Sequence, residues 1–101
     1  MERRPHIEVP TEKLVEFCQR HHIRRLAFFG SVLRDDFRPD SDVDVLVEFE
    51  PGHVPGLLGL AGLEIGLSGL LGGRKVDLNT PGFFGPVLRE RIQAEAVAQY
   101  G

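Results

Sequence analysis

Residues 30–49, GSVLRDDFRPDSDVDVLVEF, combine a Gly-Ser turn, a charged segment and a strand-like run with two aspartates near its start. Side chains alternate along a strand, so Asp42 and Asp44 are predicted to share one face, while the valines among them point into the core. Two neighbouring carboxylates repel each other, and burying either of them is unfavourable. The stretch therefore predicts a strand whose aspartates either face water or pair with a cation.

Hydrophobic periodicity predicts a small α/β (α+β) fold. Apolar runs at residues 23–29, 43–49 and 75–78 are typical of strands. Helical spacing predicts helices over residues 11–22, 54–73 and 86–99, with Thr11 as the first N-cap and a short helical turn beginning at Ser31. This order favours a single domain, residues 1–101, in which helices pack on a short mixed central sheet.

Bulk composition is that of an ordinary globular domain. The chain has 101 residues, of which 42% are hydrophobic and 27% charged, enough for one core. A net charge of -3 does not favour direct nucleic-acid binding. Cys18 is the single cysteine, so we expect no disulfides and a cytoplasmic location. The first ten residues, MERRPHIEVP, lack the apolar centre of a signal peptide.

The glycine-rich segment 54–73 allows more than one interpretation. It is apolar and long enough to suggest a membrane span. Glu64 near its centre, interior glycines and a stripe of leucines at helical spacing instead favour a weak helix held by packing. We expect no membrane association. The leucine stripe and Phe83-Phe84 are candidates for a docking surface, although core packing is the favoured role of both.

A third acid can join the first two. Asp77 lies in the alternating segment 75–78, and if that strand pairs beside residues 43–49 on the same face, three carboxylates form one cup. Ligands that are all oxygen favour Mg²⁺ or Mn²⁺, and paired carboxylates can bridge two ions. Turn aspartates on a wet sheet edge would give the same pattern. An EF-hand loop is excluded, because Val45 and Pro51 stand where glycine and glutamate are required.

The Gly30-Ser31 pair predicts a turn suited to phosphate. Backbone N–H groups at such a turn are expected to be unpaired, and glycine lets an anion approach the main chain. The Ser31 hydroxyl and the Arg34 guanidinium can reach the same place. A Gly-Ser pair is also common in ordinary capped turns, and the P-loop pattern is absent. Asp42 lies only eleven positions after Ser31, so a phosphate site would face a metal site.

This combination resembles the signature of the minimal nucleotidyltransferases, a branch of the DNA polymerase β-like superfamily. Their pattern is Gly-Ser, an arginine usually followed by glycine, then D-x-D and a later strand acid. The residues in these places are Gly30, Ser31, Arg34, Asp42, Asp44 and Asp77. Asp35 replaces the usual glycine. The phrases PDSDVDVLVEF, GRKVDLNTP and LRERIQAEAVAQY also resemble the short members that act as antitoxins to HEPN-domain ribonucleases.

The resemblance implies a Mg²⁺-dependent transfer of AMP from ATP to a tyrosine of a HEPN toxin, within a hetero-oligomer of the two proteins. It implies that Asp42, Asp44 and Asp77 are catalytic and bind two Mg²⁺ ions, or Mn²⁺, and that Asp77 also helps to deprotonate the acceptor. Gly30 and Ser31 would then hold the β- and γ-phosphates of the NTP, and Arg34 would neutralise them.

Two alternatives to this function stay open. One is a non-catalytic antitoxin that inhibits a HEPN ribonuclease by forming a complex with it. The other is a nucleotidyltransferase acting on small molecules, which the lack of a second, acceptor-binding lobe disfavours.

Overall fold

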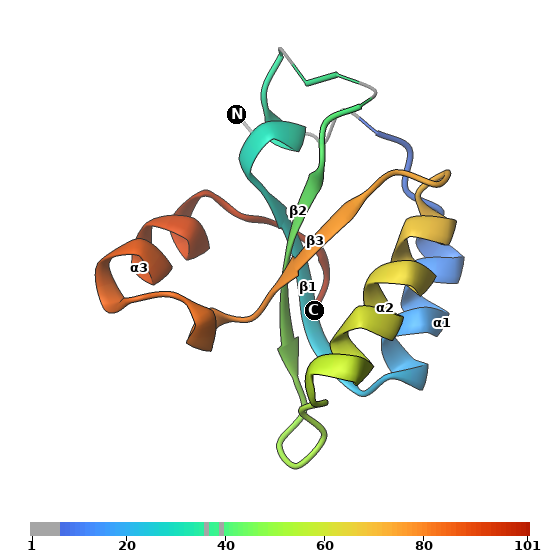
Figure 1. Cartoon of the computed structure of the whole chain (residues 1–101), viewed down its shortest axis with the longest axis vertical. Helices are drawn as coiled ribbons and strands as arrows, with labels where there is room; N and C mark the ends of the chain where they lie inside the picture. The colour runs from blue at the N-terminus through green and yellow to red at the C-terminus, as the bar shows by residue number, and fades with distance from the viewer. Residues whose placement is uncertain (1–6, 36, 39) are drawn as a thin grey trace.

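The sheet is mixed, as predicted. The structure is a computed structural model, which describes residues 7–35, 37–38 and 40–101 (Figure 1). In this part of the chain, one sheet contains β1 (Ile23–Phe29), β2 (Val43–Phe49), β3 (Val76–Asn79) and β4 (Val97–Tyr100). Their order is β3-β2-β1-β4. β1 runs antiparallel to β2 and β4, whereas β2 and β3 are parallel.

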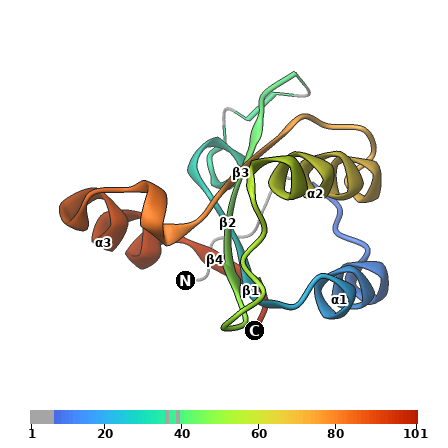
Figure 2. The same ribbon diagram turned by 60° about the horizontal axis from the view of Figure 1, so that its bottom comes forward.

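The helices lie on both faces of the sheet (Figures 1 and 2). α1 (Thr11–Arg20) and α2 (Leu57–Leu70) pack side by side on one face. α3 (Pro86–Glu95) projects from the opposite face. Two single 3₁₀ turns, η1 (Gly30–Leu33) and η2 (Pro81–Phe83), follow β1 and β3. The two faces of the sheet are therefore covered very differently.

The main hydrophobic core fills the space between the sheet and the α1–α2 layer. Val43, Val45 and Val47 of β2 belong to this core, as alternation predicts, and Leu67 of α2 packs with them. On the opposite face, Ala27 and Leu46 are direct cross-strand partners and are buried outside the main core. One face of the sheet thus carries a thick apolar layer, and the other carries a thin one.

The chain after Glu95 departs from the prediction. The helix predicted over residues 86–99 ends at Glu95, and Ala96 is extended, with ψ 140°. Residues 97–100 then pair with β1 as a fourth strand, which the sequence did not predict. Alanine and glutamine are good helix formers, but hydrogen bonding to the edge of β1 overrides that preference. At the first helix, Pro10 takes the N-cap position that we assigned to Thr11.

α2 has one buried face and one exposed face. Leu63 and Leu67 are buried, which confirms core packing for this side of the helix. Leu58 and Ile65 are 92% and 76% exposed, so the other side is an apolar surface in contact with water. Among the described residues, no helix combines the length and the apolar character needed to cross a membrane.

Candidate active site

Strand pairing brings two of the predicted acids together. Asp44 on β2 and Asp77 on β3 are direct partners in the parallel register. The N–H of Val43 donates to the carbonyl of Lys75 at 2.8 Å and holds this register. Paired residues point to the same side of a sheet, here the side opposite α1 and α2. The predicted pairing is therefore confirmed, and Asp42 lies directly before β2 at the same end.

Asp44 is the electrostatic centre of this group. It is half-buried, whereas Asp42 and Asp77 are exposed. Burial raises the pKa of Asp44 above its ordinary value of 3.8, and the charges of Asp77 and Asp42 raise it further. A backbone hydrogen bond from Ser31 and the charge of Arg34 act in the opposite direction on this pKa. A cation beside Asp44 would relieve this excess of negative charge.

The Gly-Ser turn abuts the Asp44 carboxylate. Gly30 has a left-handed φ of 74°, and a Cβ at this position would overlap Oδ2 of Asp44. Glycine therefore satisfies two demands at once, the backbone conformation and the close approach. The Ser31 hydroxyl donates to the Asp42 carbonyl at 3.2 Å. The structure thus joins the turn to both aspartates of the D-x-D pair.

The backbone N–H groups of the turn are not unpaired, and our prediction for them is wrong. The Gly30 N–H donates to Oε1 of Glu95 at 3.2 Å. The Ser31 backbone donates to Asp44. Both acceptors are carboxylates from segments distant in sequence, which a prediction based on the local turn could not include. Arg34 is exposed beside the turn, and its own N–H closes η1 on the Ser31 carbonyl at 2.9 Å.

Glu95 is the site residue that the sequence analysis missed. It ends α3 and lies 65 positions from Gly30 in the sequence, so no local spacing connects the two. At the other end of α3, the Phe84 ring packs edge-on against Phe29, with centroids 6.3 Å apart. The neighbouring Phe83 is 55% exposed, so core packing does not hold for it.

Asp35 causes no backbone strain at the end of the turn. Among the described non-glycine residues, positive φ occurs at His22 alone. Asp35 therefore keeps an ordinary φ, and the glycine that resembling proteins carry here is not required for conformational reasons.

The three aspartate carboxylates are ligands of the type that a hard divalent cation prefers, although their side chains do not converge on one point. Carboxylate oxygens are the ligands that Mg²⁺ and Mn²⁺ prefer. In the described ranges of the chain, no three His, Cys, Asp or Glu side chains are close enough together to hold a metal ion. The predicted three-carboxylate cup is thus not preassembled. Because Asp42 and Asp77 are exposed, their side chains can change rotamer toward Asp44.

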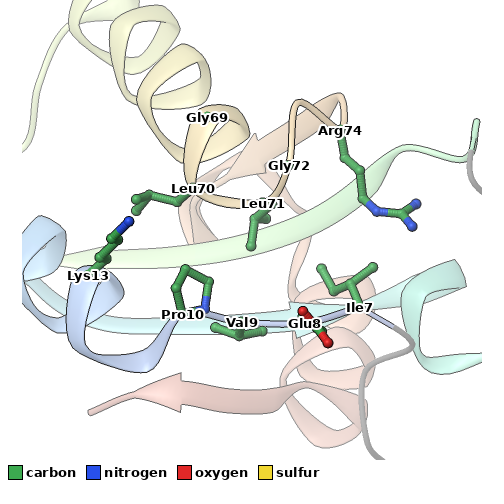
Figure 3. A pocket seen from close by; sticks show the side chains of 10 residues that line it. All are labelled: Ile7, Glu8, Val9, Pro10, Lys13, Gly69, Leu70, Leu71, Gly72 and Arg74. Atoms are coloured by element: carbon green, nitrogen blue, oxygen red, sulfur yellow. The ribbon is translucent and has the colours of Figure 1, made fainter.

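A large pocket lies away from these residues. It measures about 790 Å³ and lies between residues 7–10 and the C-terminal end of α2 (Figure 3). Lys13 and Arg74 point to different sides of it, and none of the six predicted site residues lines it. The candidate active site is therefore the sheet face that carries the carboxylates, and not this pocket.

Comparison with known proteins identifies the family. Residues 11–98 match the model of the nucleotidyltransferase domain. This chain belongs to the nucleotidyltransferase family. It is 38% identical over 85 residues to a candidate protein adenylyltransferase of Methanocaldococcus jannaschii, covering 84% of this chain and 88% of that protein. It is 46% identical over 63 residues to the protein adenylyltransferase MntA of Thermococcus cleftensis, covering 62% and 61%.

Several solved structures share the fold. A candidate minimal nucleotidyltransferase superposes with a TM-score of 0.71 at 42% identity, covering 86% of each chain. A toxin–antitoxin complex with AMP-PNP has a TM-score of 0.73 at 18% identity, covering 92% of this chain and 74% of the other. The MntA–HepT toxin–antitoxin pair has a TM-score of 0.64 at 17% identity, covering 90% and 69%. The last two likenesses concern the fold alone.

Proposed function

We propose that this protein is an antitoxin that transfers AMP from ATP to a tyrosine hydroxyl of a HEPN ribonuclease toxin in a Mg²⁺-dependent reaction. The observation that carries the proposal is the register of Asp44 with Asp77, on an open sheet face directly beside Gly30. The family is that of nucleotidyltransferases, and relatives are named protein adenylyltransferases. Structures with the same fold include a toxin–antitoxin complex with AMP-PNP.

The three aspartates would form the metal site. Asp44 is held in place by the turn, and Asp42 and Asp77 would close on the cation by rotamer changes. Two Mg²⁺ ions, or Mn²⁺, would stabilise negative charge on the attacking and leaving oxygens when bound. The raised pKa of Asp44 in the metal-free protein fits this role, since repulsion from Asp77 and Asp42 contributes to it.

The turn and Arg34 would hold the triphosphate. Because the Gly30 and Ser31 backbone N–H groups already have acceptors, the Ser31 hydroxyl and the exposed Arg34 guanidinium are the donors assigned to the β- and γ-phosphates. The hydroxyl can rotate from the Asp42 carbonyl to a phosphate oxygen. The role of Gly30 is to let the chain pass close to Asp44.

Transfer requires an acceptor proton to leave. The tyrosine oxygen forms a bond to the α-phosphorus, the bond from that phosphorus to the β-bridging oxygen breaks, and pyrophosphate departs. Asp77 is the exposed carboxylate proposed to accept the hydroxyl proton. In this proposal, in-line geometry and charge neutralisation would account for the catalysis.

Labelled ATP tests the function directly. The protein is incubated with α-³²P-ATP, MgCl₂ and a purified HEPN toxin, and label on a HEPN tyrosine is measured. We expect labelling that disappears in Asp44→Asn and Asp77→Asn and is kept in Glu90→Ala, an exposed control on α3. Labelling that persists without both aspartates would refute the site.

The same experiment also distinguishes enzymatic transfer from a second candidate function, inhibition of the toxin by binding alone. If no label is transferred but the ribonuclease is still inhibited by the wild-type protein and by Asp44→Asn, the protein is a non-catalytic antitoxin. The exposed apolar residues of α2 and α3 provide surface for such a complex.

A further inference from the structure

On both sides of α3 the chain contacts the end of β1 or the Gly-Ser turn that follows it. Of its ten residues, all within the described part of the chain, only Ile92 is buried. Before its first turn, the Phe84 ring packs against Phe29. At its last residue, Glu95 accepts the Gly30 N–H at 3.2 Å. Phe29 and Gly30 are consecutive, so Phe84, two residues before α3, and Glu95, its last residue, contact neighbouring positions at the end of β1.

The position of Gly30 controls the surroundings of the Asp44 carboxylate. Phe29 is the cross-strand partner of Asp44, and the next residue, Gly30, lies so close that no Cβ would fit. The following residue, Ser31, donates its backbone N–H to Asp44. Any movement of the Gly30 amide would therefore change two contacts of this carboxylate.

Glu95 occupies a place that helix energetics disfavours. The C-terminus of a helix carries a partial negative charge, and acidic residues there are destabilising. No basic residue stands in the last turn of α3 to compensate, and the whole of that turn is described. Glu95 therefore gains its hydrogen bond from the Gly-Ser turn and not from its own helix, which motivates a role at the site that it contacts.

We propose that Glu95 is a positioning residue for nucleotidyl transfer, which holds the Gly30-Ser31 turn against Asp44 through the Gly30 N–H. The catalytic consequence rests on the proposed function, whereas the contact does not. Glu95 acts through the turn and touches no reacting atom. Because the hydrogen bond is exposed, its loss is expected to lower the transfer rate only about two- to tenfold.

Three variants separate the hydrogen bond from the charge. Glu95→Ala removes the acceptor, Glu95→Gln keeps an acceptor oxygen without charge, and Glu90→Ala removes an exposed charge from the same helix. The initial rate of AMP transfer is measured against MgCl₂ concentration at saturating ATP. We expect Glu95→Ala to need more Mg²⁺ for half-maximal rate and to lose about two- to tenfold in rate. Glu95→Gln and Glu90→Ala should stay within about twofold of wild type.

An NMR measurement of the Gly30 amide gives a readout that does not depend on activity. Its hydrogen-exchange rate should rise in Glu95→Ala and stay near the wild-type rate in Glu95→Gln and Glu90→Ala. Unchanged exchange in Glu95→Ala would overturn the inference and leave the proposed function intact. A Gln variant as slow in transfer as the Ala variant would overturn it as well, because charge and not positioning would then be responsible. A wild-type protein without transfer activity would instead refute the proposed function.

Discussion

The two faces of the sheet divide stability from chemistry. The face toward α1 and α2 carries the main core, in which Val45 and Leu67 are fully buried. The face toward α3 carries Asp44 and Asp77 in register, beside a thin apolar layer. Because strand residues alternate, the same short strand supplies both faces. The aspartates of one face can therefore be unfavourable for folding, provided that the apolar side chains of the opposite face bury enough surface to keep the domain stable.

The largest effect expected from this division is on activity. Asp44→Asn should lower the rate of AMP transfer by at least about 100-fold, because the carboxylate central to the metal site is lost. In EDTA, the same change should leave the free energy of unfolding equal or higher. Burial and the charges of two neighbouring carboxylates disfavour the ionised form of Asp44, and asparagine carries no charge. Transfer assays and urea unfolding of one protein preparation check both effects. A variant that loses both activity and several kcal/mol of stability would contradict the division of roles between the two faces.

A change on the core face should have the opposite profile. Leu67→Ala should reduce the free energy of unfolding by about 2–5 kcal/mol, through lost burial and the cavity left behind. Leu58→Ala on the same helix is the matched control: its side chain is 92% exposed, so we expect a change within about 0.5 kcal/mol. Urea unfolding measures both variants. Similar values for the two would contradict the assignment of the buried face of α2.

The Gly-Ser turn allows a finer test at the border of the two faces. Gly30→Ala and Gly52→Ala both place a Cβ at positive φ, 74° and 81°, which costs about 1–2 kcal/mol. Only the first Cβ meets another residue, the Asp44 carboxylate, whereas the second meets open space. Gly30→Ala should therefore be the more destabilising of the two and should also slow transfer. Equal destabilisation and normal transfer would show that the close approach to Asp44 is unimportant.

The smallest effect is a pH dependence. The folded-state pKa of Asp44 lies above its ordinary value of 3.8, so the folded metal-free protein binds this proton more tightly than the unfolded chain. The resulting stability is present below the ordinary value and is lost as pH rises through the folded pKa. In EDTA, Asp44→Asn should thus gain stability over wild type between about pH 4 and pH 7. A constant difference across this range would contradict the raised pKa of Asp44.

The strands that carry the site could be predicted from the sequence, because their apolar patterns are long. Residues 23–29 and 43–49 were predicted with the bounds that the structure has. β4 could not be predicted, since its four residues mix helix-favouring and strand-favouring types and become a strand only by pairing with β1. The contact of Glu95 with Gly30 was out of reach for a related reason: it spans 65 positions and depends on where α3 ends.

The most direct test of the central claim is a crystal structure of the protein with Mn²⁺ and a non-hydrolysable ATP analogue, with an anomalous map to locate the metal. The account predicts a manganese peak between the carboxylates of Asp44 and Asp77, with Asp42 turned toward it and the triphosphate beside Ser31. A bound nucleotide whose metal lies away from these three carboxylates would contradict it.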